Sequence, residues 1–201
     1  MSSFFVYIPI KPIGFLILHG FKWILLMENS YVNAVDFFKS KASYKGESTL
    51  ILAAYELRTP ENVGALIRLA GNLGLAKIYF ISQVNSFNAS KIARVAHSSL
   101  KHVDFTFCTP EEFMANIPPD YELIGVETSK NATNLFATKL PEKCILLLGN
   151  ERYGIRQDFL DKCKKTVFIP LLGKTLSMNV SHAAALATFE WGRQHLGLES
   201  M

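Results

Sequence analysis

The sequence contains few of the residues from which metal centres and disulfide frameworks are built. Its 201 residues include only three cysteines, Cys108, Cys144 and Cys163, which lie far apart and form no Cys-x-x-Cys pair. Zinc ligands usually come at short, fixed spacings, so no metal site is expected. A sparse, odd-numbered set of cysteines is typical of a reducing cytoplasm, where we expect the protein to act. Cys144 begins an apolar segment and is interpreted as a core residue rather than a nucleophile.

Charged residues and internal repeats are also scarce. Charged residues make up 19% of the chain and hydrophobic residues 49%, a balance that indicates a compact globular protein and excludes a disordered one. The formal net charge of +4 permits a polyanionic partner without requiring one. No Gly-x-Gly-x-x-Gly turn follows an early strand, which argues against a dinucleotide-dependent oxidoreductase.

Uninterrupted hydrophobic runs are missing even from the most apolar part of the chain, residues 4–26. Prolines, lysines and a histidine interrupt it, so no run of about 18 apolar residues remains to span a bilayer. No basic segment precedes it, as a signal peptide would require. Two interpretations stay open: Met27 is the natural start, or residues 1–26 form an appendage that packs on the domain or on a partner subunit. We expect an N-terminal extension over residues 1–46 and one domain over residues 47–201, with no membrane contact.

Within that domain, apolar strands alternate with amphipathic helices. The pattern predicts strands at residues 49–55, 77–82, 103–108, 123–127, 144–148 and 166–169. It predicts helices at residues 60–73, 89–96, 110–116, 156–162 and 180–195, and a short one at 32–38. Such alternation is typical of an α/β fold, a parallel sheet with helices on both faces. Ligands of these sheets bind outside the carboxyl ends of the strands.

Three segments of the domain carry polar residues next to expected strand or helix ends. The first is TPENVGALIR, residues 59–68, in which Thr59 and Pro60 are typical of a helix start. Its arginine, Arg68, lies almost opposite the apolar stripe of the expected helix. The second is LLLGNERYGI, residues 146–155, in which Gly149 ends a strand and lets the backbone approach a ligand closely. By itself it would also suit a plain turn.

The third segment is IPLLGKTLSMNVSH, residues 169–182, followed by an alanine-rich helix. Ser177 or Asn179 is expected to cap that helix. Taken together and in this order, the three segments resemble the sequence motifs of the SpoU (TrmH-like) branch of the SPOUT RNA methyltransferases. The resemblance covers roughly residues 48–195.

This resemblance implies a fold and an activity. It implies a SPOUT domain whose C-terminal part threads into a trefoil knot, and a homodimer whose active sites combine residues of both subunits. The implied reaction is methyl transfer from S-adenosyl-L-methionine to a ribose 2′-hydroxyl of structured RNA, without a metal. Because only about 46 residues precede the domain, tRNA is favoured over rRNA as the substrate. The alternative is an RNA-binding module of the same fold that has lost catalysis.

The resemblance also implies the site residues. Those implied in catalysis are Arg68, Asn62, Glu151, Ser177 and Asn179. Those implied in binding the cofactor are Glu127, Thr128, Gly149, Ile169, Leu171, Ser177 and Met178.

The role of Arg68 stays open between a general base and a clamp on an RNA phosphate. Because a guanidinium with a pKa above ~12 is a poor base at neutral pH, physical chemistry favours the clamp. A basic strip around Lys91 and Arg94 suits either an RNA-facing surface or a solvated helix face.

Overall fold

The computed structural model describes residues 48–83 and 87–197. The expected extension over residues 1–46, with its short helix at 32–38, lies outside these ranges. The strands of the described domain are β1 (Ile51–Tyr55), β2 (Lys77–Ile81), β3 (Phe105–Cys108), β4 (Glu122–Val126), β5 (Thr133–Asn134), β6 (Cys144–Leu148) and β7 (Lys165–Phe168). Its α-helices are α3 (Pro60–Leu73), α4 (Ala89–Ala96), α5 (Pro110–Ala115), α6 (Gln157–Leu160) and α7 (Val180–His195), and its 3₁₀ helices are η1 (His97–Lys101) and η2 (Leu135–Ala137).

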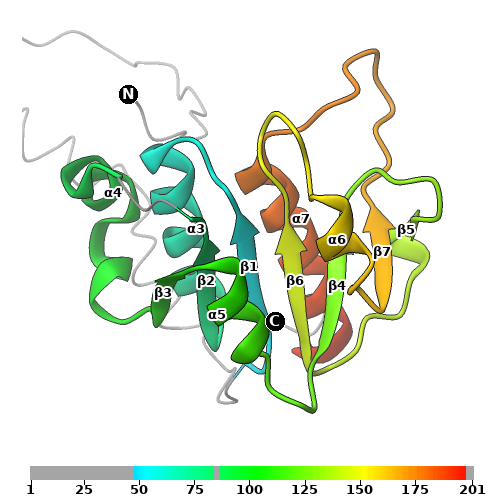
Figure 1. Ribbon diagram of the computed structural model, residues 1–201, viewed down its shortest axis with the longest axis horizontal. Helices are drawn as coiled ribbons and strands as arrows, with labels where there is room; N and C mark the ends of the chain where they lie inside the picture. The colour runs from blue at the N-terminus through cyan, green and yellow to red at the C-terminus, as the bar shows by residue number, and fades with distance from the viewer. Residues whose placement is uncertain (1–47, 84–86, 198–201) are drawn as a thin grey trace, which may run out of the picture. The chain divides into compact units, whose positions relative to one another are not determined.

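The described strands form one sheet in the order β3-β2-β1-β6-β4-β7-β5 (Figure 1). All of its strand pairs are parallel, which confirms the predicted α/β class. β6 lies at the centre, with Ile145 paired to Ile51 of β1 on one side and to Leu123 of β4 on the other. Because β6 is buried on both faces, its sequence CILLL is continuously apolar rather than alternating.

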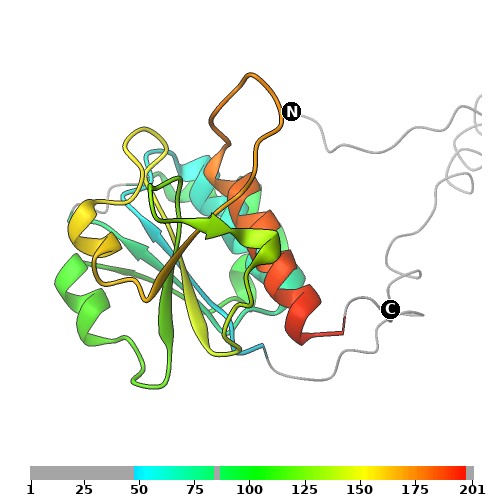
Figure 2. The same ribbon diagram turned by 90° about the vertical axis from the view of Figure 1, so that its right-hand side faces the viewer.

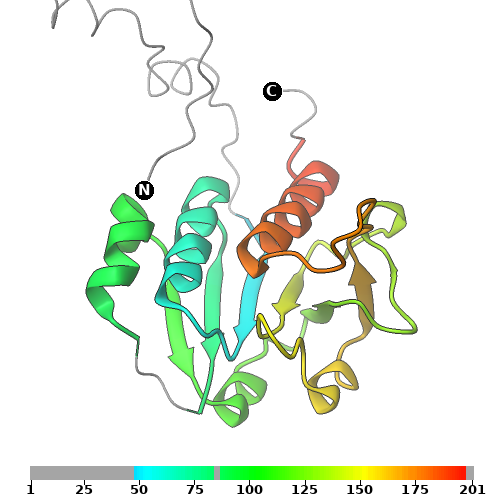
Figure 3. The ribbon, with the colours of Figure 1, turned by 90° about the horizontal axis from the view of Figure 1, so that it is seen from above.

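Helices cover both faces of the sheet, as predicted (Figures 2 and 3). One face packs under α3, α4 and α7, and its core includes Leu52, Leu146 and Trp191. The other face packs under α5 and α6, and its core includes Ile145 and Phe159. Successive residues of a strand point to opposite faces, so Ile145 and Leu146 enter different cores. The sheet therefore lies between two layers of helices. The helices cover its faces, and the loops at the carboxyl ends of its strands are left to form a site.

Local sequence signals explain where α3, the helix that carries the first motif, begins and ends. The hydroxyl of Thr59 accepts a hydrogen bond from the backbone N–H of Asn62, and Pro60 occupies the first turn of α3. Gly74 ends α3 in the left-handed conformation, with φ at 59°. A Cβ on Gly64 would lie 2.7 Å from the carbonyl oxygen of Ile92, so the absence of a side chain lets α3 and α4 pack closely.

The structure differs from the predicted elements mainly at short segments. α4, β6 and α7 have the predicted bounds, whereas α6 is shorter than the predicted 156–162. β5, η1 and η2 were not anticipated. Each spans five residues or fewer, too short to show a hydrophobic period.

Candidate functional site

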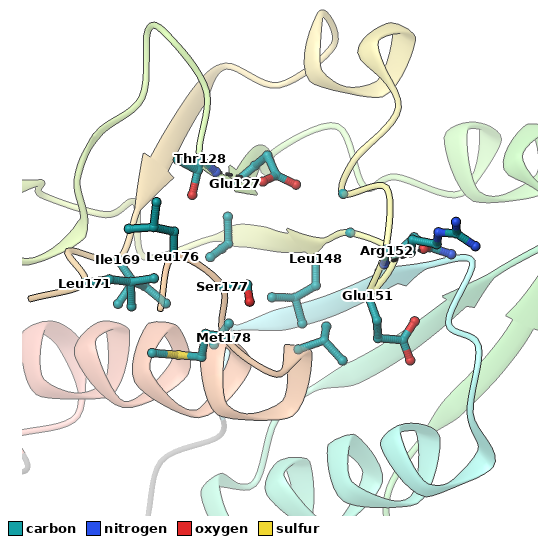
Figure 4. A pocket seen from close by; sticks show the side chains of 16 residues that line it. Glu127, Thr128, Leu148, Glu151, Arg152, Ile169, Leu171, Leu176, Ser177 and Met178 are labelled. Carbon is teal, nitrogen blue, oxygen red and sulfur yellow. Dashed lines mark hydrogen bonds between the residues drawn. The ribbon is translucent and has the colours of Figure 1, made fainter. Parts of the chain in front are cut away.

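The loops that follow β4, β6 and β7 meet at one edge of the sheet and enclose a pocket of about 270 Å³. Figure 4 shows this pocket with the side chains that line it. The lining residues are Val126, Glu127, Thr128, Leu148, Gly149, Asn150, Glu151, Arg152, Gly154, Ile169, Leu171, Leu176, Ser177, Met178, Val180 and Ala183. All seven residues implied in cofactor binding are among them. This is the edge at which parallel sheets bind ligands.

The loop after β6 folds tightly back on itself. Asn150 and Gly154 exchange two backbone hydrogen bonds of 3.0 and 2.9 Å. This closure brings the loop over Gly149, where a Cβ would lie 2.3 Å from the carbonyl carbon of Gly154 and 2.5 Å from the nitrogen of Ile155. Gly154 has a φ of 68°, which favours glycine. The two glycines therefore shape one wall of the pocket.

The carboxylate of Glu127 fastens this loop to the end of β4. One oxygen accepts a hydrogen bond from the backbone N–H of Ile155 at 2.9 Å, and the other accepts one from that of Thr128 at 2.8 Å. Because the carboxylate is occupied in this way, the side chain of Glu127 holds the loops together.

The opposite wall of the pocket is apolar and comes from the third motif. Ile169 and Leu171 follow β7, and Met178 precedes α7 beside them (Figure 4). The side chain of Leu176 is 81% exposed although it lines the pocket. An apolar wall that faces glycine backbone suits a flat, mostly apolar group with polar edges, such as a nucleobase.

A chain of hydrogen bonds joins the three motifs beside the pocket. The side-chain amide of Asn62 donates to Glu151 Oε1 at 2.6 Å, and its oxygen accepts from Asn179 Nδ2 at 3.2 Å. Glu151 also accepts from the backbone N–H of Arg58 at 2.9 Å. Asn179 caps α7, as expected, because its Oδ1 accepts a hydrogen bond from the N–H of Ser181. Hydrogen bonds thus hold Asn62, Glu151 and Asn179 together, although Asn62 and Asn179 are 117 positions apart in the sequence.

Ser177 precedes Asn179 by two residues and lines the pocket. Its side chain points into the pocket in Figure 4 and is exposed. Among the residues that the structure describes, no partner hydrogen-bonds its hydroxyl. That hydroxyl is therefore available to a ligand, either as a donor or as an acceptor.

Arg68 is the one implied site residue that neither lines the pocket nor joins the hydrogen-bonded chain of Asn62, Glu151 and Asn179. It lies on the exposed face of α3 and does not line the pocket. Six residues of α-helix separate it from Asn62, an advance of about 9 Å along the axis and about 240° around it. Arg68 therefore points away from the side of α3 on which Asn62 bonds Glu151 and Asn179.

Sequence reasoning missed Asn150, whose side chain organises the loop. Asn150 Nδ2 donates to the backbone oxygen of Glu56 at 2.6 Å. Its Oδ1 accepts from the N–H groups of Arg152 and Tyr153 at 2.8 and 3.1 Å. An asparagine that follows a strand-ending glycine is a known turn former, because its side chain bonds the backbone ahead of it. That signal was present in the Gly149–Asn150 pair.

Cys144 lies in the core rather than in the pocket, which confirms its interpretation. It is fully buried in β6, and burial raises the pKa of its thiol to about 12. Over residues 48–83 and 87–197, no cluster of three or more metal-ligating side chains occurs. The same ranges hold no helix with the length and apolarity needed to cross a bilayer.

Comparison with known proteins places these motifs in a family. The chain matches the SpoU rRNA Methylase family over residues 49–189. It is similar to the 23S rRNA (guanosine-2′-O-)-methyltransferase RlmB of Acinetobacter baylyi, with 30% identity over 155 residues, 75% of this chain and 62% of that protein. The chain spans less than two thirds of the length of the curated relatives that it matches.

Solved structures share the fold. One, described as giving structural insights into the 2-OH methylation of C/U34 on tRNA, has a TM-score of 0.67 and 26% identity, and the match covers 74% of this chain and 97% of that one. Another is the SpoU methyltransferase AviRb from Streptomyces viridochromogenes in complex with the cofactor AdoMet. Its TM-score is 0.66 and its identity 25%, over 76% of this chain and 62% of that one.

Proposed function

Because the chain belongs to the SpoU rRNA Methylase family, we propose that it transfers a methyl group from S-adenosyl-L-methionine to a ribose 2′-hydroxyl of structured RNA. The observation that carries the proposal is the meeting of the three motifs. Glu151, Asn62 and Asn179 form one hydrogen-bonded chain beside a pocket that the second and third motifs line. The cofactor bound in AviRb and the 2′-O-methyltransferase name of RlmB support it.

The pocket residues fit this cofactor by their chemistry. Ile169, Leu171 and Met178 offer an apolar frame for adenine, and the backbone at Gly149 permits a close approach. Glu127 and Thr128, which also line the pocket, would hold the remainder of the cofactor through their main chain. When bound, the sulfonium supplies an already activated methyl group; the products would be the 2′-O-methylated ribose, the neutral thioether S-adenosyl-L-homocysteine and a proton released to water. The protein then has to position the ribose hydroxyl in line with that methyl group, which is an orientational task.

Asn62, Glu151 and Asn179 are proposed to hold the geometry of the reacting centre, with the free hydroxyl of Ser177 next to it. Each polar atom of the Asn62 side chain already has a partner, so its orientation is fixed before substrate binds. Such preorganisation saves the cost of ordering these groups during the reaction. The hydroxyl of Ser177 then remains as the adjustable donor to the ribose.

Arg68 is proposed to serve the active site of a second subunit. It does not line its own pocket, yet the resemblance of the first motif implies this arginine in catalysis. As a clamp, its planar guanidinium would hold an RNA phosphate through two hydrogen bonds and stabilise the developing alkoxide. This role requires a homodimer, with the knotted regions of the two subunits facing each other. The knot itself stays a prediction.

Exposed apolar side chains on α7 support a dimer. Leu186 is 38% exposed and Phe189 48% exposed, one turn apart on the same helix. Leu172 and Leu176, in the loop just before this helix, are 100% and 81% exposed. Large apolar side chains gathered on one helix and its preceding loop are typical of a surface that another protein covers.

A basic surface beside Arg68 is proposed to contact RNA. Lys91 and Arg94 on α4 lie 4.0 and 3.9 Å from Glu61, and all three side chains are about half exposed or more. Exposed pairs of this kind contribute little to stability, so both cations remain available to phosphates. Glu61 and Arg68 are two turns apart on α3 and therefore share its exposed face.

Methyl transfer tests the proposal. Labelled S-adenosyl-L-methionine would be incubated with unmodified tRNA and, separately, with unmodified rRNA. We expect one RNA class, with tRNA favoured, to accept label from the wild type. Arg68→Ala should abolish the transfer, whereas Asn72→Ala, on the same exposed face of α3, should not. Arg68→Lys should recover little activity, because lysine lacks the planar fork. Cofactor binding without transfer to either RNA would instead favour the inactive RNA-binding module.

Mixing Arg68→Ala with Gly149→Ala, at a cofactor concentration too low for either variant alone to transfer methyl groups, tests the composite site. In a homodimer with shared sites, Arg68→Ala and Gly149→Ala subunits combine into heterodimers that hold one intact site. We expect the mixture to recover about a quarter of wild-type transfer, the share expected from random pairing. No recovery in a mixture shown to contain heterodimers would place Arg68 in the site of its own subunit.

A further inference from the structure

An aromatic side chain stands exposed at the tip of the loop that closes the pocket. Tyr153 is 75% exposed, although tyrosine commonly buries its ring. The guanidinium carbon of Arg152 lies 5.2 Å from the centre of this ring. Arg152 itself lines the pocket, so this Arg–Tyr pair lies next to the proposed cofactor site.

The backbone beneath the pair is held firmly. Asn150 accepts hydrogen bonds from the N–H groups of both Arg152 and Tyr153, and the Asn150–Gly154 bridge closes the loop around them. An aromatic ring on such a loop loses little further freedom when it binds, because only its own two side-chain torsions remain to be fixed. The loop therefore presents the ring at a defined position.

The cation of Arg152 is also left without an acidic partner. Over the described ranges, no carboxylate lies within ion-pair distance of its guanidinium. By contrast, Arg156 pairs with Asp158 and Arg193 with Glu190. A guanidinium that rests on an exposed ring and has no carboxylate presents both a positive charge and a flat surface. RNA offers the complement of each, a phosphate and an unstacked base.

We propose that Tyr153 and Arg152 form a stacking platform for an unstacked RNA base at or next to the reacting ribose. This inference rests on the proposed function and deepens it, because it specifies the substrate as a nucleotide in a single-stranded loop or bulge. Bases inside a duplex stack on each other and do not expose a face to an aromatic side chain. Tyr153 is then a residue that selects the RNA and has no part in binding the cofactor.

The platform is tested with variants that distinguish the effect of an aromatic ring from the effect of a large apolar side chain. Tyr153→Phe keeps the ring, whereas Tyr153→Leu keeps an apolar side chain without one. Phe136→Leu is the matched control, because Phe136 is 48% exposed and does not line the pocket. For each variant, kcat and KM would be measured for the RNA class that the wild type methylates. The dissociation constant for S-adenosyl-L-methionine and the mass in solution would be measured in parallel.

We expect Tyr153→Leu to raise KM for RNA about tenfold, within the range that loss of one stacked base produces. Tyr153→Phe and Phe136→Leu should stay within about twofold of wild type, since neither removes the platform ring. Cofactor affinity and mass should be the same in all four proteins. Wild-type kinetics in Tyr153→Leu would overturn the proposal. So would a loss of mass, which would mean that Tyr153 packs against a second copy of the chain.

Failure of the proposed function has a separate readout. If the wild type methylates no RNA, the platform is tested by fluorescence anisotropy with an end-labelled single-stranded oligoadenylate. Weaker binding by Tyr153→Leu, with normal binding by Tyr153→Phe, would still support a base-stacking platform. Equal binding by both variants and the wild type would overturn it.

Discussion

Replacing Gly149 with alanine should damage the pocket more than its small size suggests. The added Cβ would lie 2.3 Å from the carbonyl carbon of Gly154 and 2.5 Å from the nitrogen of Ile155. Both are backbone atoms of a loop that two mutual hydrogen bonds close, so no flexible side chain can move aside. To reach an ordinary contact distance, the loop would have to withdraw by about 1 Å, which is an overpacking strain.

The cost of that strain must appear either in stability or in cofactor affinity. Overpacking of this kind costs about 1–3 kcal/mol. If the loop stays in place, about 2 kcal/mol of strain lowers the melting temperature by about 4–8 °C for a domain of this size. If the loop withdraws, it must return to its original position when the cofactor binds. The same 2 kcal/mol then raises the dissociation constant for the cofactor about 30-fold. The loss of stability and the loss of cofactor affinity should together account for the strain energy.

Calorimetric titration with S-adenosyl-L-methionine and thermal melting measure both parts. Gly173→Ala is the matched control, because a Cβ on Gly173 would meet nothing within 4 Å and the residue lies in the third motif. This control should bind and melt like the wild type. If Gly149→Ala also binds the cofactor and melts like the wild type, then the close approach between Gly149 and the loop is not as argued, and the pocket wall is misassigned.

Three further perturbations test the interactions around the site and the core. Asn62→Asp should destabilise the domain by about 2 kcal/mol at pH 7, because a second carboxylate replaces the amide that donates to Glu151. This loss should shrink in urea unfolding at pH 4–5, where a proton restores the bond. Arg193 holds the pKa of the buried Glu190 below its ordinary value, so that pair stabilises the fold above about pH 4.3 and less as the pH falls through the lowered pKa. The stability difference between wild type and Glu190→Gln should therefore diminish in acid, and a pH-independent difference would contradict the assignment. Burial raises the pKa of the three cysteine thiols to about 11 or 12, so a thiol reagent at pH 8 should label none of them until the protein unfolds.

Elements with strong local signals could be predicted from the sequence. The start of α3 follows from Thr59 and Pro60, and its end follows from Gly74. The continuous apolar run of β6 indicates a strand buried on both faces, which is what the centre of a parallel sheet requires. The seven residues implied in cofactor binding also gather at one pocket, because the loops that carry them follow neighbouring strands.

Contacts between distant residues could not be predicted in the same way. Nothing in the local sequence indicates that the amide of Asn62 bridges Glu151 and Asn179, since that depends on where α3 and α7 meet β6. The role of Glu127 was missed for the same reason: its partner, the N–H of Ile155, lies 28 residues further along the chain. The exposure of Arg68 followed from helical periodicity, but its distance from the pocket required the packed structure.

Analysis of the methylated nucleoside would identify both the chemistry of the reaction and its dependence on Arg68. RNA of the accepting class would be incubated with S-adenosyl-L-methionine and either the wild type or Arg68→Ala, digested to nucleosides, and examined by mass spectrometry. We predict one 2′-O-methylated nucleoside with the wild type and none with the variant. Methylation of a base, or a 2′-O-methylated product of equal yield with Arg68→Ala, would contradict it.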